Sequence, residues 1–240
     1  MRIIYTYDTN NGDNYCSGYT FVDGFVYSAN VSVRSCILLG HSVEIYADSH
    51  GVKFLKEKLL DSEKVNFYVV DFSRFNYDRR FWNFAKLVNY SIQTSPFIHV
   101  DFDIVFHYGF GLQTKGQKNY IITEMRRDVD SMLYSKMFPE IEEKQDNIIC
   151  SGILGGDRID IFNSNFRKAV TFCANGIHKN VRFDHLVGIE EYHFTNIVDN
   201  FSDAKVIELN EKTYTHWQGS NKWTRFGKDI MAYYNLYFNT

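Results

Sequence analysis

The sequence of 240 residues has little of several features that mark other protein classes. It contains only 2 prolines, and its longest apolar runs are too short to span a bilayer. Its formal net charge of −3 gives no basic footprint, so nothing indicates nonspecific binding to nucleic acid. Hydrophobic residues make up 45% and charged residues 23%, which excludes a disordered or fibrous chain. We expect a soluble globular protein without a transmembrane segment, for which peripheral membrane contact stays open.

Cysteine is also scarce and widely spaced. Cys16, Cys36, Cys150 and Cys173 form no C-x-x-C pair, which fits neither a zinc site nor a secreted disulfide framework. The first residues enter a strand-like run without the charged and apolar regions of a signal peptide. Both observations predict reduced thiols and a cytoplasmic location.

The first half of the chain alternates apolar runs with segments of helical period. Strands are expected at 2–7, 42–47, 65–70 and 97–100, and helices at 19–39, 51–60 and 79–94. This alternation predicts an α/β fold with a mostly parallel sheet and helices on both faces.

The second half is less regular, and no internal repeat or linker divides the chain. Strands are expected at 120–124, 148–154 and 206–209, and helices at 160–174, 189–201 and near the carboxy terminus. The aromatic residues at 233–238 are expected to close the core, with an acceptor, a membrane or a second subunit as the alternative contact. We therefore expect residues 1–240 to form one domain.

An Asp-x-Asp pattern follows the fourth expected strand. Asp101 and Asp103 come directly after the apolar segment 97–100, at the sheet edge where open α/β folds bind ligands. Residues two apart in an extended segment point the same way, so both carboxylates can face one pocket while Phe102 packs behind them. Carboxylate oxygens suit hard cations such as Mg²⁺ or Mn²⁺. The pattern predicts a metal site, and its alternative is that the aspartates merely cap the next turn.

These features resemble the GT-A glycosyltransferases, a Rossmann-like fold whose Asp-x-Asp motif also follows a buried strand. A second match is His216-Trp217-Gln218-Gly219-Ser220-Asn221-Lys222, which is similar to the His-x-x-Gly-x-x-Lys segment of the retaining family that includes glycogenin and lipopolysaccharide galactosyltransferases. The resemblance implies that His216 completes the metal site. It also implies that Lys222 meets the diphosphate of the sugar donor and that Gly219 lets the backbone approach it.

Weaker matches add candidates for binding the nucleotide sugar. The run Tyr5-Thr6-Tyr7-Asp8 ends the first strand where the family holds the base and ribose. Lys86 lies on the helix before the metal strand, where the family places a basic residue near the sugar donor. A solvated surface lysine is the alternative for Lys86.

Two further segments resemble the walls of the family's sugar pocket. The run from Cys150 to Gly156 resembles a small-residue Asn-x-Gly strand, with Ser151 in place of the asparagine. Glu190 and Glu191 resemble the acidic segment beside the reacting sugar, and the spacing does not decide which of them faces the pocket.

The resemblance as a whole implies a metal-dependent transferase that uses Mn²⁺ or Mg²⁺. The sugar donor would be a nucleotide sugar, with a uridine diphosphate sugar favoured, and the acceptor would be a glycan or another molecule that the sequence does not identify. Residues 1–106 would bind the nucleotide sugar and residues 107–240 the acceptor. A retaining reaction is favoured, in polysaccharide or glycan biosynthesis.

Two other functions compete with this interpretation. A sugar nucleotidyltransferase can use the same sheet edge, but the loop at 8–14 has no lysine or arginine. A non-enzymatic carbohydrate- or partner-binding protein is the second alternative, against which the complete set of Asp101, Asp103, His216 and Lys222 argues.

Overall fold

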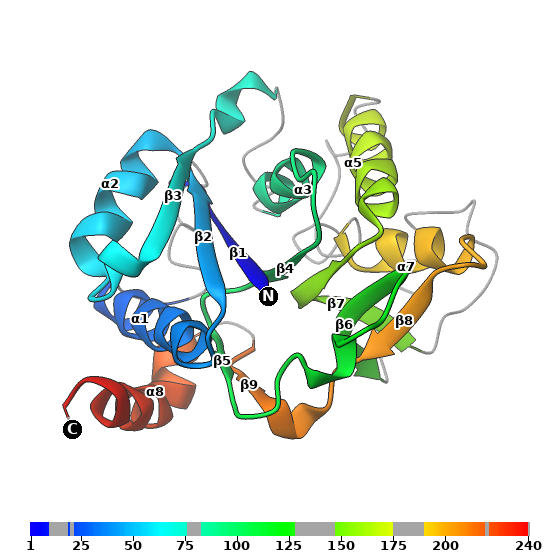
Figure 1. Cartoon of the computed structure of the whole chain (residues 1–240). Coiled ribbons are helices and arrows are strands. Elements are labelled where there is room, and N and C mark those ends of the chain that lie inside the picture. The colour runs from blue at the N-terminus through cyan, green and yellow to red at the C-terminus, as the bar shows by residue number, and fades with distance from the viewer. Residues whose placement is uncertain are drawn as a thin grey trace.

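The computed structural model of the chain describes residues 1–9, 19, 22–75, 83–127, 147–174, 190–218 and 221–239. Within these residues, seven strands form one sheet (Figure 1). In their order across the sheet, the strands are β3 (Val65–Val69), β2 (Ser42–Ala47), β1 (Arg2–Tyr7), β4 (Phe97–Val100), β7 (Asn147–Gly156), β6 (Tyr120–Arg127) and β8 (Lys205–Glu208). The sheet thus runs through both halves of the chain.

Most neighbouring strands run parallel. The pairs β3–β2, β2–β1, β1–β4 and β6–β8 are parallel, whereas β7 is antiparallel to both β4 and β6. Strands covered on both faces need apolar side chains in continuous runs, and Ile3, Ile4 and Tyr5 of β1 are completely buried. The predicted mostly parallel sheet is confirmed.

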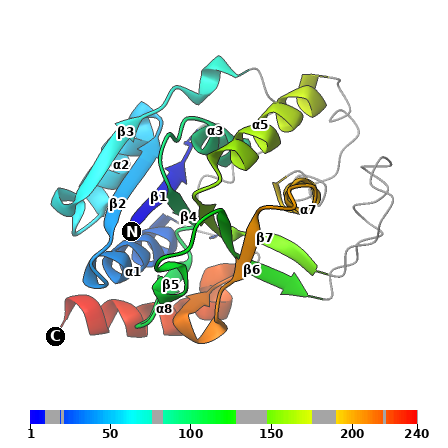
Figure 2. The same cartoon turned by 45° about the vertical axis from the view of Figure 1, so that its right-hand side comes forward.

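Helices cover both faces of the sheet, as predicted (Figures 1 and 2). The helices of one face are α1 (Val22–Leu38), α2 (Ser49–Lys58) and α8 (Lys222–Phe238). Those of the other face are α3 (Phe84–Ser91), α5 (Ile159–Ala174) and α7 (Tyr192–Asp199). Short 3₁₀ turns at Ser62–Lys64, Phe72–Arg74, Leu112–Thr114 and Glu211–Thr213 connect these elements.

The sequence analysis missed a small second sheet. Strand β5 (Ile104–Phe106) pairs antiparallel with β9 (Tyr214–His216), and Ile104 lies opposite His216. Runs of three residues carry too little periodicity to be recognised. This pairing brings the carboxy-terminal histidine next to the Asp-x-Asp segment.

Several helix boundaries differ from the predicted ones, with α2 at Ser49–Lys58 against 51–60 and α7 at Tyr192–Asp199 against 189–201. The helix expected at 79–94 is observed as α3 over Phe84–Ser91, and residues 79–82 lie outside the described part. Ile92, which lies within the predicted helix, follows α3 and is 45% exposed. The helix expected at 19–39 begins at Val22 as α1.

Small polar residues of α1 hold the Asp-x-Asp segment in place. Ser28 Oγ donates a hydrogen bond to the carbonyl of Phe102 at 2.7 Å, and the Phe106 amide donates to Ser35 Oγ at 3.1 Å. Small side chains let the helix approach this backbone closely. The segment after β4 is therefore fixed by α1.

Helix α8 packs on α1 and carries the aromatic tail. Tyr27 of α1 stacks on Trp223 and meets Tyr234 edge-on, with ring centroids 5.7 and 4.9 Å apart. This contact agrees with the expectation that the tail closes the core. None of the helices in the described part is long and apolar enough to cross a membrane.

Candidate functional site

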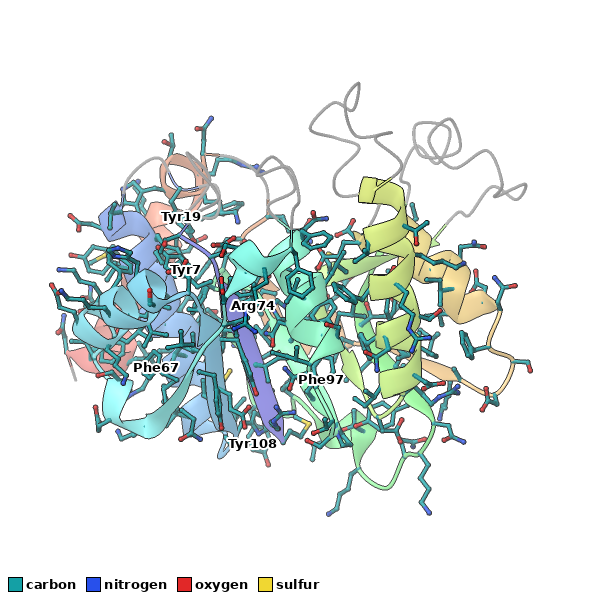
Figure 3. All side chains as sticks on the ribbon, turned by 90° about the horizontal axis from the view of Figure 1, so that it is seen from above. Tyr7, Tyr19, Phe67, Arg74, Phe97 and Tyr108 are labelled. Carbon is teal, nitrogen blue, oxygen red and sulfur yellow. The ribbon has the colours of Figure 1, made fainter. Side chains whose placement is uncertain are left out.

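The candidate site lies where β4 ends. Asp101 follows β4, and its amide donates to the carbonyl of Gly152 in β7 at 2.9 Å. Strand β7 is longer than β4 and continues past its end, so the middle of β7 lies beside this edge. Figure 3 shows Tyr7, the last residue of β1, near Tyr19 and well away from Tyr108. The edge therefore collects residues from β1, β4 and β7.

Asp101 is paired with Lys86. Nζ of Lys86 lies 2.8 Å from Oδ1 and 2.9 Å from Oδ2 of Asp101, so the lysine is a buried partner of the carboxylate and not a solvated surface residue. Burial raises the pKa of Asp101, against the effect of the Lys86 ammonium, and the charge of Asp103 adds to the rise. The two aspartates thus repel each other at close range.

Asp103 is paired with Lys222 and His216. Its Oδ2 accepts a hydrogen bond from the Lys222 ammonium and lies 3.7 Å from Nε2 of His216. Although burial favours the neutral acid, the charges of Lys222 and His216 together lower the pKa of Asp103 below its usual range. Asp103 is 2% exposed, and its Oδ1 has no hydrogen-bond partner among the described residues.

Phe102 packs behind the two carboxylates, as the extended segment predicts. Its ring stacks on Tyr5 at 4.6 Å between centroids and meets Tyr7 and Phe25 edge-on at 6.2 and 5.5 Å. These contacts put the aromatic side chain into the core under α1. Asp101 and Asp103 are left at the sheet edge.

His216 is held by two further side chains. Its Nδ1 lies 2.7 Å from Oε2 of Glu124 in β6 and 2.9 Å from Nε2 of Gln218. Oε1 of Glu124 in turn accepts a hydrogen bond from Nε2 of Gln218 at 3.0 Å. A histidine whose Nδ1 faces a carboxylate presents Nε2 to a cation, the arrangement common around metal-bound imidazoles.

Gly152 makes room for this imidazole. A Cβ atom built on Gly152 would lie 2.4 Å from Cε1 of His216, which no side chain can accept. The pairing of β6 with β7 also shifts between Thr123 and Glu124, an irregularity that redirects side chains at sheet edges. The predicted small-residue strand is therefore present, with His216 against its glycine.

The two acidic residues at 190 and 191 face different partners. Oε1 of Glu190 accepts a hydrogen bond from Tyr90 at 3.1 Å and lies 3.7 Å from Nζ of Lys86. Oε1 of Glu191 instead accepts hydrogen bonds from the amide and hydroxyl of Ser151 at 3.1 and 3.2 Å. Glu190 is thus the one that adjoins the Lys86–Asp101 pair. Burial raises the pKa of Glu190 to about 7, against Lys86 and with the help of Asp101 and Glu191.

The side chains of Tyr5 and Tyr7, at the end of β1, are buried in the core. The Tyr5 side chain is completely buried, and its hydroxyl lies 2.9 Å from Ser32 Oγ and 3.2 Å from Cys36 Sγ. The Tyr7 ring packs against the rings of Phe25 and Phe54 in the core. Contacts of these two side chains with a nucleotide therefore form no part of our proposal.

Thr6 and Asp8 are the other two residues of this predicted run. Thr6 Oγ1 accepts a hydrogen bond from Asn89 at 2.7 Å and lies 3.1 Å from Nε2 of His99, on the α3 side of the sheet. Asp8 lies just beyond β1 and is 4% exposed. Gly219 lies outside the described residues, so its predicted approach to phosphate stays a prediction.

The residues present fit a divalent cation at Asp103 and His216. The buried Oδ1 of Asp103 lacks a partner among the described residues, and the site offers hard carboxylate oxygens with an imidazole held by Glu124. Asp101 adjoins them, with both of its oxygens turned to Lys86.

Sequence reasoning missed Glu124 in this site. A carboxylate within the strand predicted at 120–124 was the available signal, because a charge in a buried strand needs a partner. That the partner would be His216, 92 residues later, follows only from the pairing of the two sheets around it.

Two glycosyltransferases are among the solved structures that this chain resembles. The galactosyltransferase LgtC, in complex with donor and acceptor sugar analogues, matches with a TM-score of 0.52 at 10% identity, over 100% of this chain and 97% of that chain. The apo form of mouse xyloside xylosyltransferase 1 matches with a TM-score of 0.51 at 11% identity, over 97% and 93% of the two chains.

A third similar structure has a different activity in its name. It is the nucleoside-diphosphate-sugar pyrophosphorylase from Vibrio cholerae RC9, with a TM-score of 0.50 at 10% identity over 95% of this chain and 100% of that chain. At such identities the likeness establishes the fold alone. The GT-A fold expected from the sequence is confirmed, whereas the narrower retaining family stays a prediction.

Sequence comparisons add a family but no activity. No curated protein is detectably similar in sequence to this chain. The model of a family of unknown function, DUF6734, matches residues 1–228. The chain therefore belongs to the family DUF6734, and it has the GT-A fold.

Proposed function

We propose that the chain is a metal-dependent glycosyltransferase that uses a nucleotide-sugar donor, with a uridine diphosphate sugar favoured. The observation that carries the proposal is Asp103, a buried carboxylate at the end of β4 with His216 and Lys222 against one oxygen and no described partner at the other. Burying a polar oxygen is costly unless a ligand or partner compensates it, and a cation at Oδ1 would supply what Lys222 and His216 supply at the other oxygen. The named activities of the two similar transferases support the same class.

Asp101, Asp103 and His216 would hold Mn²⁺ or Mg²⁺. The bound cation supplies positive charge to the diphosphate that leaves when the glycosidic bond to the nucleotide breaks. The protein's own part is to keep these ligands in place through Lys86 and Glu124.

Lys222 and Lys86 provide the remaining positive charge. Lys222 is the first residue of α8, and its ammonium can turn from Asp103 towards a diphosphate, where it offsets developing negative charge. Lys86 stays between Asp101 and Glu190 and keeps the two acids from repelling each other.

Glu190 is the acidic residue that we place beside the reacting sugar. Its contacts with Lys86 and Tyr90 aim it at the Asp101 side of the site, whereas Glu191 secures Ser151. In a retaining reaction Glu190 would stabilise the positively charged sugar, and in an inverting one it would act as the base. We favour retention, which assignment of the product's anomeric configuration tests.

The acceptor is assigned to the second half of the chain. Residues 1–106 contain β1, β4 and the aspartates, which suits the nucleotide sugar, and residues 107–240 contain Glu190 and β7. A glycan is the acceptor class we expect.

Calorimetric binding of uridine diphosphate tests the donor site. We expect binding in the presence of Mn²⁺ that is lost with a chelator and in Asp103→Asn. The control is Asp203→Asn, which removes an exposed carboxylate on Arg158 away from the site. Metal-independent binding, or equal binding by both variants, would contradict the proposal.

A sugar nucleotidyltransferase is the alternative function, because the third similar structure is named as a nucleoside-diphosphate-sugar pyrophosphorylase. A nucleotidyltransferase would convert a sugar 1-phosphate and a nucleoside triphosphate into a nucleotide sugar and pyrophosphate. Release of pyrophosphate from such a mixture would favour that function. A protein that binds the nucleotide sugar without ever turning it over would instead be a carbohydrate-binding protein.

A further inference from the structure

Three side chains of different chemistry meet beside His216. Glu124 of β6 and Cys150 of β7 are directly opposite each other in the antiparallel pair, so both project to the same face. The imidazole of His216 reaches them over Gly152. The ligand atoms of Glu124, Cys150 and His216 all lie within 4.8 Å of one another, the one such group of His, Cys, Asp or Glu among the described residues.

The amide nitrogen of Gln218 marks the centre of this group. Nε2 of Gln218 lies 3.0 Å from Oε1 of Glu124, 2.9 Å from Nδ1 of His216 and 3.9 Å from Sγ of Cys150. Three potential ligand atoms thus surround one amide nitrogen. A metal ion at this point would need bonds of about 2.0–2.3 Å, so the three groups would have to close in by about an ångström or somewhat more. The Gln218 side chain would have to withdraw from this point, and its amide, turned over, could then offer the carbonyl oxygen as a fourth ligand.

The charges of the group match a divalent ion. Glu124 as a carboxylate and Cys150 as a thiolate supply two negative charges, and His216 would bind as a neutral imidazole. Both Glu124 and Cys150 are buried, so a neutral complex avoids the cost of an uncompensated buried charge. Sulfur and imidazole ligands favour zinc over the magnesium and manganese that suit the all-oxygen aspartates.

We propose that Glu124, Cys150 and His216 form a second cation site, selective for borderline-soft divalent ions of the zinc class. Binding releases the thiol proton of Cys150 and the Nδ1 proton of His216 to solvent, forms metal bonds to sulfur, nitrogen and oxygen, and displaces the amide of Gln218. His216 serves this site through Nδ1, whereas it faces Asp103 through Nε2. The site does not depend on the transferase activity.

Cobalt(II), which reports its ligands in its absorption spectrum, is the probe. One equivalent of Co²⁺ added to the reduced full chain is expected to give a thiolate-to-cobalt charge-transfer band and intense visible bands typical of tetrahedral coordination. Zn²⁺ is expected to abolish both at one equivalent. A spectrum without a thiolate band would overturn the proposal.

Variants assign the band to its cysteine. Cys150→Ala is expected to remove the band. Cys36→Ala is the matched control that retains it, because Cys36 is a buried cysteine of α1 in a hydrogen bond with Tyr5. A band that survives Cys150→Ala would place the cobalt elsewhere and refute the site. If Cys150→Ala does not fold, zinc X-ray absorption of the wild-type chain decides instead, by the presence or absence of one sulfur at about 2.3 Å.

Sharing of His216 makes the two sites compete. Saturation with Zn²⁺ is expected to weaken Mn²⁺ binding at Asp103, measured by the paramagnetic resonance of free Mn²⁺. This consequence rests on the proposed transferase site, whereas the cobalt band does not, so failure of one result leaves the other interpretable. Unchanged Mn²⁺ affinity with the cobalt band present would refute the sharing of His216.

Discussion

Oε2 of Glu124 lies 2.7 Å from Nδ1 of His216 and leaves Nε2 of the imidazole directed at Asp103. Glu124→Gln replaces the carboxylate by an amide that orients the ring less strongly. We expect the Mn²⁺ affinity to fall about 10- to 100-fold, the usual effect of losing a carboxylate partner of a metal-bound histidine. Titration calorimetry with Mn²⁺ measures it, and the exposed Glu63→Gln is the control. Equal affinities would show that the contact does not orient His216.

Gly152→Ala is expected to displace His216. The added methyl would lie 2.4 Å from Cε1 of the ring, so the ring must move away from its present position. We expect a loss of Mn²⁺ affinity comparable to that of His216→Ala, together with about 1–3 kcal/mol of destabilisation from overpacking. Urea unfolding separates the two effects. Unchanged Mn²⁺ affinity in a folded Gly152→Ala protein would contradict the position of His216.

Substitution of Glu190 is expected to affect sugar transfer, and substitution of Glu191 the stability of the fold. Glu190→Gln should lower sugar transfer about 100-fold or more while uridine diphosphate still binds, because Glu190 adjoins Lys86 and Asp101. Glu191→Gln should chiefly lower stability, because it weakens the hydrogen bonds that Glu191 accepts from Ser151. Turnover and urea unfolding of both variants test this. The reverse assignment of the two effects would exchange their roles.

The strands of the sheet and the Asp-x-Asp segment can be predicted from the sequence. The partners of the site residues cannot, because they come from segments far apart in the chain. The four strands at 2–7, 42–47, 65–69 and 97–100 are short segments rich in apolar and aromatic residues between polar stretches, a pattern that sequence analysis detects well. Asp101 and Asp103 could be predicted as site residues because they directly follow such a strand, and strand ends are where this kind of fold binds ligands.

Partners across the fold are harder to predict. The pairing of Asp101 with Lys86 and of Asp103 with Lys222 depends on which helix lies on which face of the sheet. The core position of Tyr5 was missed because its hydroxyl is satisfied by Ser32 and Cys36 of α1, which spacing along β1 does not reveal.

His41 is expected to make the protein less stable in acid. Burial, with a contribution from the amino terminus, lowers the pKa of His41 to about 4 in the folded chain, compared with about 6.5 unfolded. Between these values the unfolded chain binds more protons, so this residue destabilises the fold as the pH falls from about 6.5 to about 4. His41→Gln removes that contribution.

Urea unfolding of the wild-type and His41→Gln proteins at several pH values measures the effect. The stability of the wild type relative to the variant should decline as the pH falls through that window and level off below about 4. A difference that is independent of pH would exclude His41 as an acid-sensitive group.

The two lysines that pair with Asp101 and Asp103 come from opposite faces of the sheet, Lys86 from α3 and Lys222 from α8. Detaching the start of α8 would leave Asp103 without the ammonium that compensates its charge, so undocking of this helix is thermodynamically linked to the charge state of the carboxylate. A cation at Asp103 can take over that role. Its arrival would therefore loosen the amino-terminal turn of α8, and amide hydrogen exchange there should quicken as the site fills.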